Sequence, residues 1–333
     1  MNIKDKIKSG IGINVLSLFD GISCGMVALE RAGVPIERYV AYEIDKYAIQ
    51  ISKKNYPNIE HRGDVTTADF KEFKGFDLLI GGSPCTYWSI AKNNREITPD
   101  GVGGKLFMNY VKALKESECK YFLYENNYSI HKNMKSFISE QLGVQPIMIN
   151  SALVSAQHRK RCYWTNIPNI SEPENCGILL KDILVSDADK YECPVITSHY
   201  RDVINKMNPE KSYCLCARDC KGFGKQSMNG VLTPIRIGSF GNGGQGQRIY
   251  SVNGKSVSLS ANGGGQGAKT GLYKVDLLDG DYVIRKLSPI EAERCQTLPD
   301  NYTEGISDTQ RYKCIGNGWT VDIIVHILNG LVG

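Results

Sequence analysis

The sequence lacks both a membrane-spanning hydrophobic run and a secretion signal. No apolar stretch approaches the roughly 20 residues that cross a bilayer. The N-terminal segment MNIKDKIKSG has no apolar core and no small-residue cleavage site. Hydrophobic residues make up 41% of the chain and charged residues 23%, proportions typical of a water-soluble globular protein. These features predict a cytoplasmic protein without a membrane partner.

Paired cysteines are missing as well. The 11 cysteines are mostly scattered singly through a chain of 333 residues, which favours reduced thiols over a disulfide framework. The densest group is Cys214, Cys216 and Cys220, with Cys193 upstream. Its spacing differs from the paired C-x2-C of common structural zinc sites, so we expect no metal.

The loop after the first apolar run also lacks the phosphate-binding pattern G-x-G-x-x-G, which disfavours a nucleotide-dependent oxidoreductase. The net charge excludes fewer classes of protein than these missing motifs do. The 40 lysines and arginines against 35 aspartates and glutamates give a net charge of +5. That excess is compatible with a polyanionic partner, but many proteins that bind no nucleic acid carry as much.

Short apolar runs alternate with helical patterns through the N-terminal part of the chain. Strands alternating with helices at this spacing predict an α/β fold with a parallel sheet. The apolar runs are residues 13–18, 39–42, 76–82 and 120–126, and the helical patterns are residues 26–32, 46–53 and 110–117.

Residues whose side chains could bind a ligand or take part in catalysis follow these predicted strands. They are Asp20, Glu43, Asp64, Cys85 and Glu125. In open α/β sheets, ligands bind at the carboxyl ends of the strands. We therefore expect a ligand site at that edge of the sheet.

The composition changes after about residue 165. Glycine becomes dense between residues 222 and 271, but apolar residues within this region still form strand-like segments. These segments predict a small, glycine-rich, mainly β second domain, against a flexible linker as the alternative. The apolar helical pattern at 321–332 should return to the first domain. The predicted divisions are 1–165, 166–284 and 285–333.

Each candidate site residue is ambiguous by itself. Gly21 and Gly25 would let a ligand approach the backbone, and Glu43 suits a ribose diol, yet a plain tight turn explains the loop equally well. A lone cysteine is more often a small buried hydrophobe than a nucleophile. Cys85 is more suggestive, because it follows a predicted strand and Pro84, and precedes a polar loop able to close over a substrate.

Two further positions are equally open. Glu125 ends a predicted strand, where it is either an acid for catalysis or a solvated strand end. Arg159 and Arg161 would point the same way on an extended segment, or form a solvated charge run.

Taken in order, eight motifs resemble the DNA cytosine-5 methyltransferase family over nearly the whole chain. The resemblance implies a Rossmann-like S-adenosylmethionine-dependent catalytic domain (1–165), a target-recognition domain (166–284), and a C-terminal segment that returns to the catalytic domain (285–333). The motifs are FDGISCG (19–25), YEID (42–45), GDV (63–65), GSPC (82–85), YENN (124–127), QHRKR (157–161), RKLSPIEAERCQTLPDNYT (285–303) and GNGWTV (316–321).

The resemblance implies a set of residues that bind S-adenosylmethionine. Phe19 would lie against the adenine, Glu43 would hold the ribose hydroxyls, Asp64 would hold the adenine amino group, and Asn317 would lie beside the methionine part. Ile44 stands where some members have an aromatic residue. The full set is Phe19, Asp20, Gly21, Ile22, Gly25, Glu43, Ile44, Asp64, Val65, Pro84 and Asn317.

The resemblance also implies the catalytic residues. Cys85 would be the nucleophile that adds to carbon 6 of a flipped-out cytosine. Glu125 would be the acid at ring nitrogen 3, Arg161 would donate to the cytosine carbonyl, and Arg159 would support Glu125. Thr86 departs from the Gln or Asn common at that position in DNA-acting members.

The glycine-rich region resembles an HhaI-like target-recognition segment, in GGQGQRIYS and SANGGGQGAKTG. Arg248 would read a guanine, and Gln245 would fill the gap left by the flipped base. Gln247 and Asn262 depart from the HhaI pattern. The implied DNA-binding residues are Ser89, Gln245, Gln247, Arg248, Tyr250, Gly264 and Gly265.

The implied partner is double-stranded DNA, which would place a monomeric enzyme at the nucleoid. It would act either beside a companion restriction endonuclease or as a solitary enzyme. A tRNA cytosine-5 methyltransferase is the main alternative, since one branch of the family acts on RNA. A catalytically silent relative is disfavoured because Cys85, Glu125 and Arg161 are all present.

Overall fold

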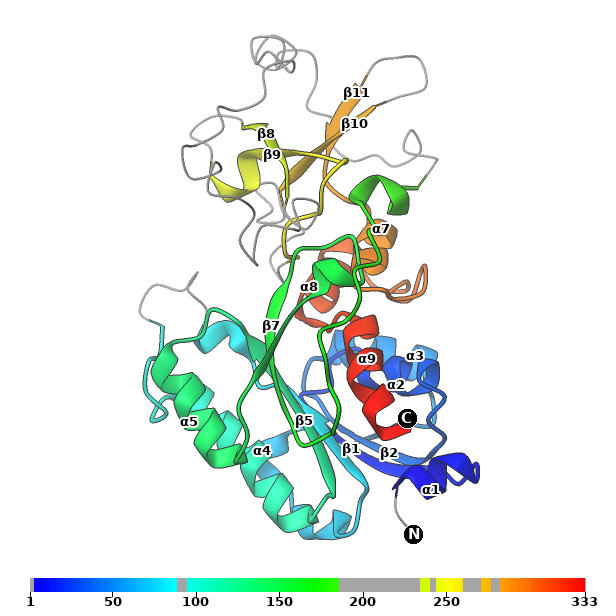
Figure 1. Ribbon diagram of the computed structural model, residues 1–333, viewed down its shortest axis with the longest axis vertical. Coiled ribbons are helices and arrows are strands. Elements are labelled where there is room, and N and C mark those ends of the chain that lie inside the picture. Colours follow the sequence, from blue (N-terminus) through cyan, green and yellow to red (C-terminus); the bar gives the residue numbers. More distant parts are fainter. Residues whose placement is uncertain are drawn as a thin grey trace.

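A computed structural model of the protein describes residues 3–88, 95–185, 234–239, 244–259, 271–276 and 282–332. These residues form a seven-stranded sheet with helices on both faces and a separate four-stranded sheet, above the large one in Figure 1. Ser89, Gly264, Gly265 and the four cysteines considered for zinc lie outside the described residues. The α/β class predicted from the sequence is confirmed.

The large sheet has the strand order β3-β2-β1-β4-β5-β7-β6. Each of the four predicted strands is present, and these strands pair in parallel. The sheet also contains β7, for which the sequence predicted no direction and which runs antiparallel to both β5 and β6. The short connection from β6 to β7 suits antiparallel pairing, because a parallel pair needs a crossover of a dozen or more residues. The strands are β1 (Ile13–Leu18), β2 (Ile36–Tyr42), β3 (Glu60–His61), β4 (Leu78–Gly81), β5 (Tyr121–Asn127), β6 (Ile147–Asn150) and β7 (Lys160–Thr165).

Both faces of the large sheet are buried. In β1, Ile13 and Val15 belong to the core on one face, and Leu16 and Leu18 to the core on the other. This two-sided burial explains why the strands appear in the sequence as continuous apolar runs. One face is covered by α1 (Ile3–Lys8), α2 (Cys24–Arg31), α3 (Lys46–Asn55) and α9 (Val321–Val332), and the other by α4 (Val102–Ser117) and α5 (Lys132–Leu142).

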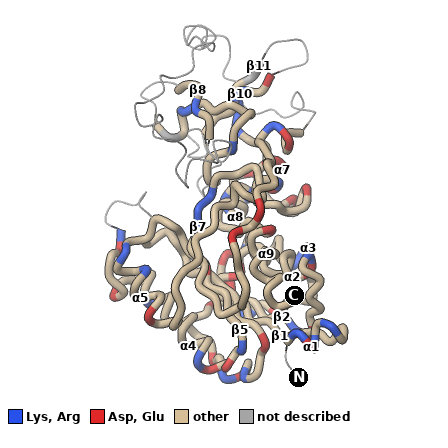
Figure 2. The backbone as a smooth tube through the Cα atoms, viewed as in Figure 1, with Lys and Arg blue, Asp and Glu red and all other residues tan. Residues whose placement is uncertain are grey.

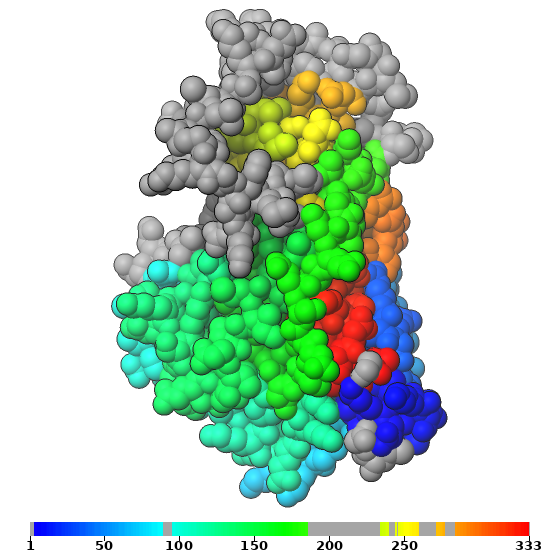
Figure 3. Space-filling view, viewed as in Figure 1, coloured from blue at the N-terminus to red at the C-terminus, as the bar shows by residue number. Residues whose placement is uncertain are grey.

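The C-terminal helix α9 packs against α2 and α1, although these helices stand at the opposite end of the sequence. In the space-filling view its red surface lies beside the blue N-terminal segment (Figure 3). The stretch Asp308–Val332 has the length and composition of a membrane span, with 50% of its most apolar window buried. Contacts with the protein core account for this apolar character, since Ile323, Ile324 and Ile327 of α9 are fully buried.

The smaller sheet has the order β11-β10-β9-β8 and mixes parallel and antiparallel pairs. Its core continues into the helices that follow it: Tyr250 and Tyr273 share one cluster with Leu287, Cys295 and Ile315. This shared core attaches the small sheet to α7 and α8. The elements are β8 (Arg236–Ser239), β9 (Arg248–Ser251), β10 (Leu272–Asp276), β11 (Tyr282–Arg285), α7 (Pro289–Cys295) and α8 (Asp308–Asn317).

Short 3-10 turns complete the described elements. They are η1 (Val65–Thr67), η2 (Phe70–Phe73), η3 (Cys85–Tyr87), η4 (Ser151–Leu153), η5 (Leu180–Ile183) and η10 (Gln245–Gln247). Of these, η3 follows the carboxyl end of β4 and begins at the candidate nucleophile. The candidate site is therefore at the sheet edge that the sequence predicts.

Candidate active site

The loop after β1 is held in an unusual conformation by Asp20. Phe19 and Ser23 both have positive φ angles, 58° and 59°, which few non-glycine residues adopt. The Asp20 carboxylate accepts hydrogen bonds from the hydroxyls of Ser17 (2.6 Å), Tyr39 (2.7 Å) and Ser23. Burial raises the pKa of Asp20 despite these bonds. Asp20 thus stabilises a strained ligand loop from within.

Glu43, after β2, holds the same loop from the other side. One carboxylate oxygen accepts from the Gly21 amide (2.8 Å), and the other from the amides of Ile44 and Asp45 (both 2.8 Å). Burial raises the pKa of Glu43, and the three amides oppose that effect. Its neighbour Ile44 is 74% exposed, which leaves a large apolar side chain beside the loop.

A cavity of about 590 Å³ opens between this loop, η3 and the turn from α8 to α9. It brings together all four predicted catalytic residues and most of the predicted cofactor residues. Those that line it are Phe19, Asp20, Gly21, Ile22, Glu43, Ile44, Pro84, Cys85, Glu125, Arg159, Arg161 and Asn317.

Three predicted cofactor residues, Gly25, Asp64 and Val65, are not part of the cavity lining. Gly25 instead allows close packing, because a Cβ atom there would lie 2.4 Å from Cδ1 of Ile80. Asp64 is exposed, and its carboxylate caps η1 by accepting from the Thr66 amide (2.8 Å). Val65 is buried in the core.

Several lining residues of α8 and of the turn after it had no role predicted from the sequence. Gln310, Lys313 and Trp319 all face the cavity, and Lys313 Nζ pairs with Asp45 Oδ2 at 2.6 Å. A signal was available, since positions 310, 313 and 317 fall on one helical face. The role of Trp319 had no such periodic signal.

Cys85 is partly exposed in the cavity, at the start of η3. Burial raises the pKa of its thiol, and the nearby Glu125 carboxylate acts in the same direction. The cations of Arg161 and Arg159 oppose this shift. In the unliganded site the thiol form is therefore favoured, and a nucleophilic thiolate requires removal of its proton.

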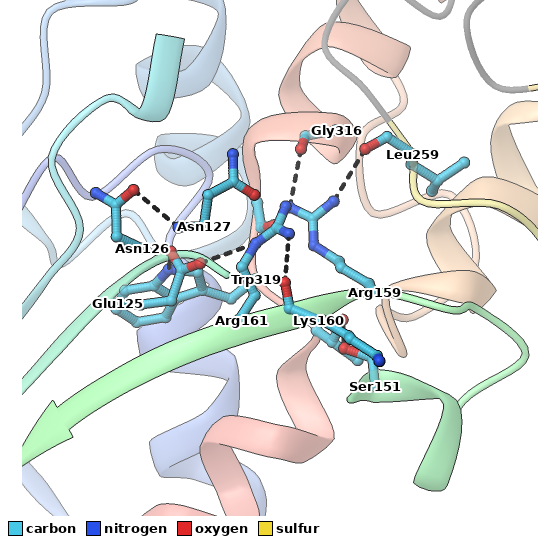
Figure 4. A network of polar contacts seen from close by, with 12 residues as sticks. Glu125, Asn126, Asn127, Ser151, Arg159, Lys160, Arg161, Leu259, Gly316 and Trp319 are labelled. Atoms are coloured by element: carbon cyan, nitrogen blue, oxygen red, sulfur yellow. Dashed lines mark hydrogen bonds and ion pairs between the residues drawn. The ribbon is translucent and has the colours of Figure 1, made fainter. Parts of the chain in front are cut away.

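Glu125 extends from β5 and is fixed at both carboxylate oxygens (Figure 4). Arg161 Nε lies 3.0 Å from Oε1, and Trp319 Nε1 donates to Oε2 at 3.0 Å. Gly82 makes room for this arrangement, since a Cβ atom there would lie 2.8 Å from the Glu125 carbonyl oxygen and 3.1 Å from Oε2. The carboxylate thus has a defined direction next to Cys85.

Arg159 differs from the expected support of Glu125. It is only 4% exposed, and its guanidinium donates to the carbonyls of Leu259 (3.0 Å), Gly316 (3.0 Å) and Gly318 (2.9 Å). These bonds use three of the five guanidinium N–H groups, and the recorded partners of Arg159 among the described residues are carbonyls and not the Glu125 carboxylate. Figure 4 shows Arg159 directed toward Gly316 and Leu259, while Arg161 reaches Glu125. Arg159 therefore ties three chain segments together beside the cavity.

The candidate recognition residues of the small sheet differ in exposure. Gln247 is exposed in η10, where its side-chain oxygen accepts from the Gly244 amide (3.1 Å). Arg248 is half-buried at the start of β9. Tyr250 is only 6% exposed, and its ring packs at 6.0 Å from that of Tyr273. The Tyr250 ring thus belongs to the core of this region and not to an exposed surface.

The fold and site define an α/β enzyme that presents a cysteine thiol and a fixed carboxylate to a ligand cavity at the strand ends. The sequence profile of the C-5 cytosine-specific DNA methylases matches residues 13–332, and the chain belongs to this family. The family and enzyme class predicted from the ordered motifs are confirmed. Enzymes of this family generally depend on S-adenosylmethionine.

Individual relatives cover almost the whole chain. The Type II methyltransferase M.HhaI of Haemophilus parahaemolyticus is 28% identical over 98% of this chain and 96% of its own length. The orphan methyltransferase M.SPRI of Bacillus phage SPR is 24% identical over 96% of this chain and 97% of its own length.

Solved structures show the same fold at low identity. The Entamoeba histolytica methyltransferase EhMeth superposes with a TM-score of 0.68 at 16% identity, covering 96% of this chain and 98% of its own. The S. pombe Dnmt2 methyltransferase gives a TM-score of 0.62 at 15% identity, with the same coverages of 96% and 98%.

Proposed function

We propose that this enzyme transfers a methyl group from S-adenosylmethionine to carbon 5 of a cytosine within a short specific site in double-stranded DNA. The observation that carries the proposal is the meeting of Cys85, Glu125 and Arg161 in one cavity with the Phe19–Ile22 loop. In this proposal residues 1–165 form the catalytic domain, residues 166–284 select the DNA site, and residues 285–333 complete the catalytic domain.

The cofactor end of the cavity fits S-adenosylmethionine in the chemistry of its donors. Glu43 is a partly buried carboxylate whose Oε2 accepts from one backbone amide, which leaves a lone pair on that oxygen for a ribose hydroxyl. Phe19 and the exposed Ile44 offer apolar surface to an adenine ring, and Asn317 would contact the methionine part. When bound, S-adenosylmethionine supplies an electrophilic methyl group on its sulfonium.

The catalytic end activates the base. The Cys85 thiol loses its proton to solvent, its sulfur forms a bond to carbon 6, and the electron pair of the 5,6 double bond shifts through carbon 5 toward carbon 4. Glu125 supplies a proton to ring nitrogen 3, and Arg161 donates to the carbonyl, which together stabilise the added form. After methyl transfer, solvent accepts the carbon 5 proton and the C–H electron pair restores the 5,6 double bond. The Cys85 thiolate leaves with the carbon–sulfur pair, and ring nitrogen 3 returns its proton to Glu125.

The substrate base must leave the duplex to reach this cavity, since neither carbon is accessible within a stacked helix. A basic cluster next in sequence to the cavity residues Glu125 and Arg161 suits a polyanion. The Lys135 and Lys160 ammonium groups lie 4.5 Å and 5.7 Å from the ring centre of Tyr128, just beyond the end of β5. Figure 2 marks basic residues at the start of β7 and on α5. Phosphate groups flanking the flipped base would complement this charge.

The test is to incubate the protein with tritiated S-adenosylmethionine and either duplex DNA or tRNA. We expect label in DNA at carbon 5 of cytosine. Label in tRNA alone would replace the proposal with the tRNA alternative, and label in neither would reject both. Bisulfite sequencing of DNA from cells that express the protein would then define the recognition site.

The biological setting follows from the same proposal. We expect a monomer that acts on DNA in the cytoplasm, either beside a companion restriction endonuclease or alone. Cleavage of unmethylated but not methylated DNA by extracts of the native host would favour the companion nuclease. Equal survival of both DNAs would favour a solitary enzyme.

A further inference from the structure

Trp319 connects the two ends of the cavity. It lies in the turn between α8 and α9 and forms part of the cavity wall. Its indole nitrogen donates to Oε2 of Glu125 at 3.0 Å (Figure 4), across a separation of 194 sequence positions. Its six-membered ring lies beside Gly25, with Cζ3 3.6 Å from the place of a Cβ at that residue. One side chain therefore contacts both the cofactor-loop helix and the catalytic carboxylate.

The other groups that face Glu125 come from three elements. Arg161 contributes a cation at 3.0 Å, and the charge of Arg159 lies further along the same segment. Cys85 faces the carboxylate from η3. Tyr124 on β5, with Cys162 and Tyr163 on β7, interact with it through space. Among the described residues, Arg161 and Trp319 are the side chains recorded within bonding distance of the Glu125 carboxylate.

The two partners act differently. Arg161 brings a full positive charge, and it is also the residue expected to donate to the base. An indole N–H carries no net charge and can only donate. Trp319 therefore acts on the Glu125 oxygen through the direction of one hydrogen bond. A donor to a carboxylate also favours the charged form over the protonated form.

Building on the proposed function, we propose that Trp319 is a positioning residue for Glu125. Its indole N–H holds Oε2 in place. The base then meets a carboxyl group of fixed direction. Loss of the indole donor should lower kcat without weakening the binding of S-adenosylmethionine.

The test uses the full-length protein and two measurements. One is the steady-state kinetics of methyl transfer to duplex DNA, and the other is the NMR signal of the Trp319 indole N–H, which is the signal missing in Trp319→Phe. Trp319→Phe keeps a ring but removes the donor. Trp319→Gln removes the ring but keeps an N–H donor. This pair separates the hydrogen bond from packing.

We expect kcat to fall about tenfold in Trp319→Phe, the equivalent of one ordinary hydrogen bond, with the KM for S-adenosylmethionine unchanged. In Trp319→Gln kcat should stay within a few-fold of wild type. An unchanged kcat in Trp319→Phe, or an equal fall in both variants, would overturn the inference.

The NMR measurement needs no substrate. The Trp319 indole N–H signal should move upfield in Glu125→Gln, because a neutral amide is a weaker acceptor than a carboxylate. A protein that methylates DNA but shows no such NMR shift would disprove the role of Trp319 alone. A protein that never methylates a nucleic acid would disprove the proposed function, while the NMR result would still stand.

Discussion

The two ends of the cavity are built in different ways. At the cofactor end, Asp20 and Glu43 are held by hydroxyls and backbone amides. At the catalytic end, Glu125 is held by a guanidinium from β7 and an indole from the turn before α9. The first arrangement fixes the shape of a loop, whereas the second fixes one reacting group. Substitutions at the cofactor end should therefore weaken cofactor binding, and substitutions at the catalytic end should lower kcat.

The largest effect is expected at Cys85. Cys85→Ala removes the proposed nucleophile, so methyl transfer should fall by at least ~1,000-fold. Binding of S-adenosylmethionine, measured by calorimetry, should stay close to wild type because the cofactor end is unchanged. Cys176→Ser is the matched control, since Cys176 is exposed and outside the cavity. Substantial activity in Cys85→Ala would exclude the covalent mechanism.

Arg161 and Arg159 provide the next comparison. Arg161→Lys keeps the charge but loses the planar group that meets Glu125, so kcat should fall about 100-fold with little change in thermal stability. Arg159→Lys removes bonds to three backbone carbonyls, so it should lower Tm by roughly 5 °C. Steady-state kinetics and thermal unfolding of both variants test this division. Equal effects of the two variants on kcat and Tm would contradict it.

At the cofactor end, Asp20→Asn should raise the Kd for S-adenosylmethionine about tenfold, the equivalent of about one hydrogen bond. An asparagine amide has only one accepting atom for the hydroxyls of Ser17, Ser23 and Tyr39. The value of kcat at saturating cofactor should change little. Asp322→Asn, on the exposed surface of α9, serves as the control. A fall in kcat without a change in Kd would remove the distinction between the two ends.

The difference between the two ends also explains what the sequence could predict. Asp20, Glu43, Cys85 and Glu125 each follow an apolar strand, and parallel strands bring such positions to one edge. The bond from Trp319 to Glu125 could not be predicted in this way. It depends on how the α8–α9 turn packs against the sheet. The spacing of apolar residues in the sequence does not predict that packing.

The same limit applies elsewhere. The contrast between Arg159 and Arg161, two residues apart on one segment, depends on which distant carbonyls and carboxylates the fold brings near them. The antiparallel direction of β7 could not be predicted, because the sequence there shows only an apolar run followed by a basic segment. By contrast, the motifs implied Asp64 in the cofactor site, but in this structure it caps a turn outside the cavity.

The raised pKa of Cys85 predicts a pH dependence for the catalytic end. Burial and the Glu125 charge reduce the thiolate fraction at neutral pH, so iodoacetamide should alkylate Cys85 several-fold more slowly than an ordinary accessible thiol. The rate should keep rising with pH beyond the usual thiol range. Mass spectrometry of the peptide that contains Cys85 measures this rate. A rate that levels off near neutral pH would show a thiolate already formed in the free enzyme.

The smallest effect is expected at the basic cluster beside the catalytic end. Lys135→Ala/Lys160→Ala should weaken DNA binding only a few-fold at physiological salt, and should lower the slope of log K against log salt by about 0.9 for each phosphate that is no longer neutralised. Lys74→Ala/Lys115→Ala removes two exposed lysines near the end of α4, away from the cavity, and should leave the slope unchanged. The salt slope is the better measurement, because it reports how many phosphates the protein neutralises even where affinity changes little. If both double variants have the wild-type slope, the phosphates do not bind at this cluster, and the DNA must approach the catalytic end from another side.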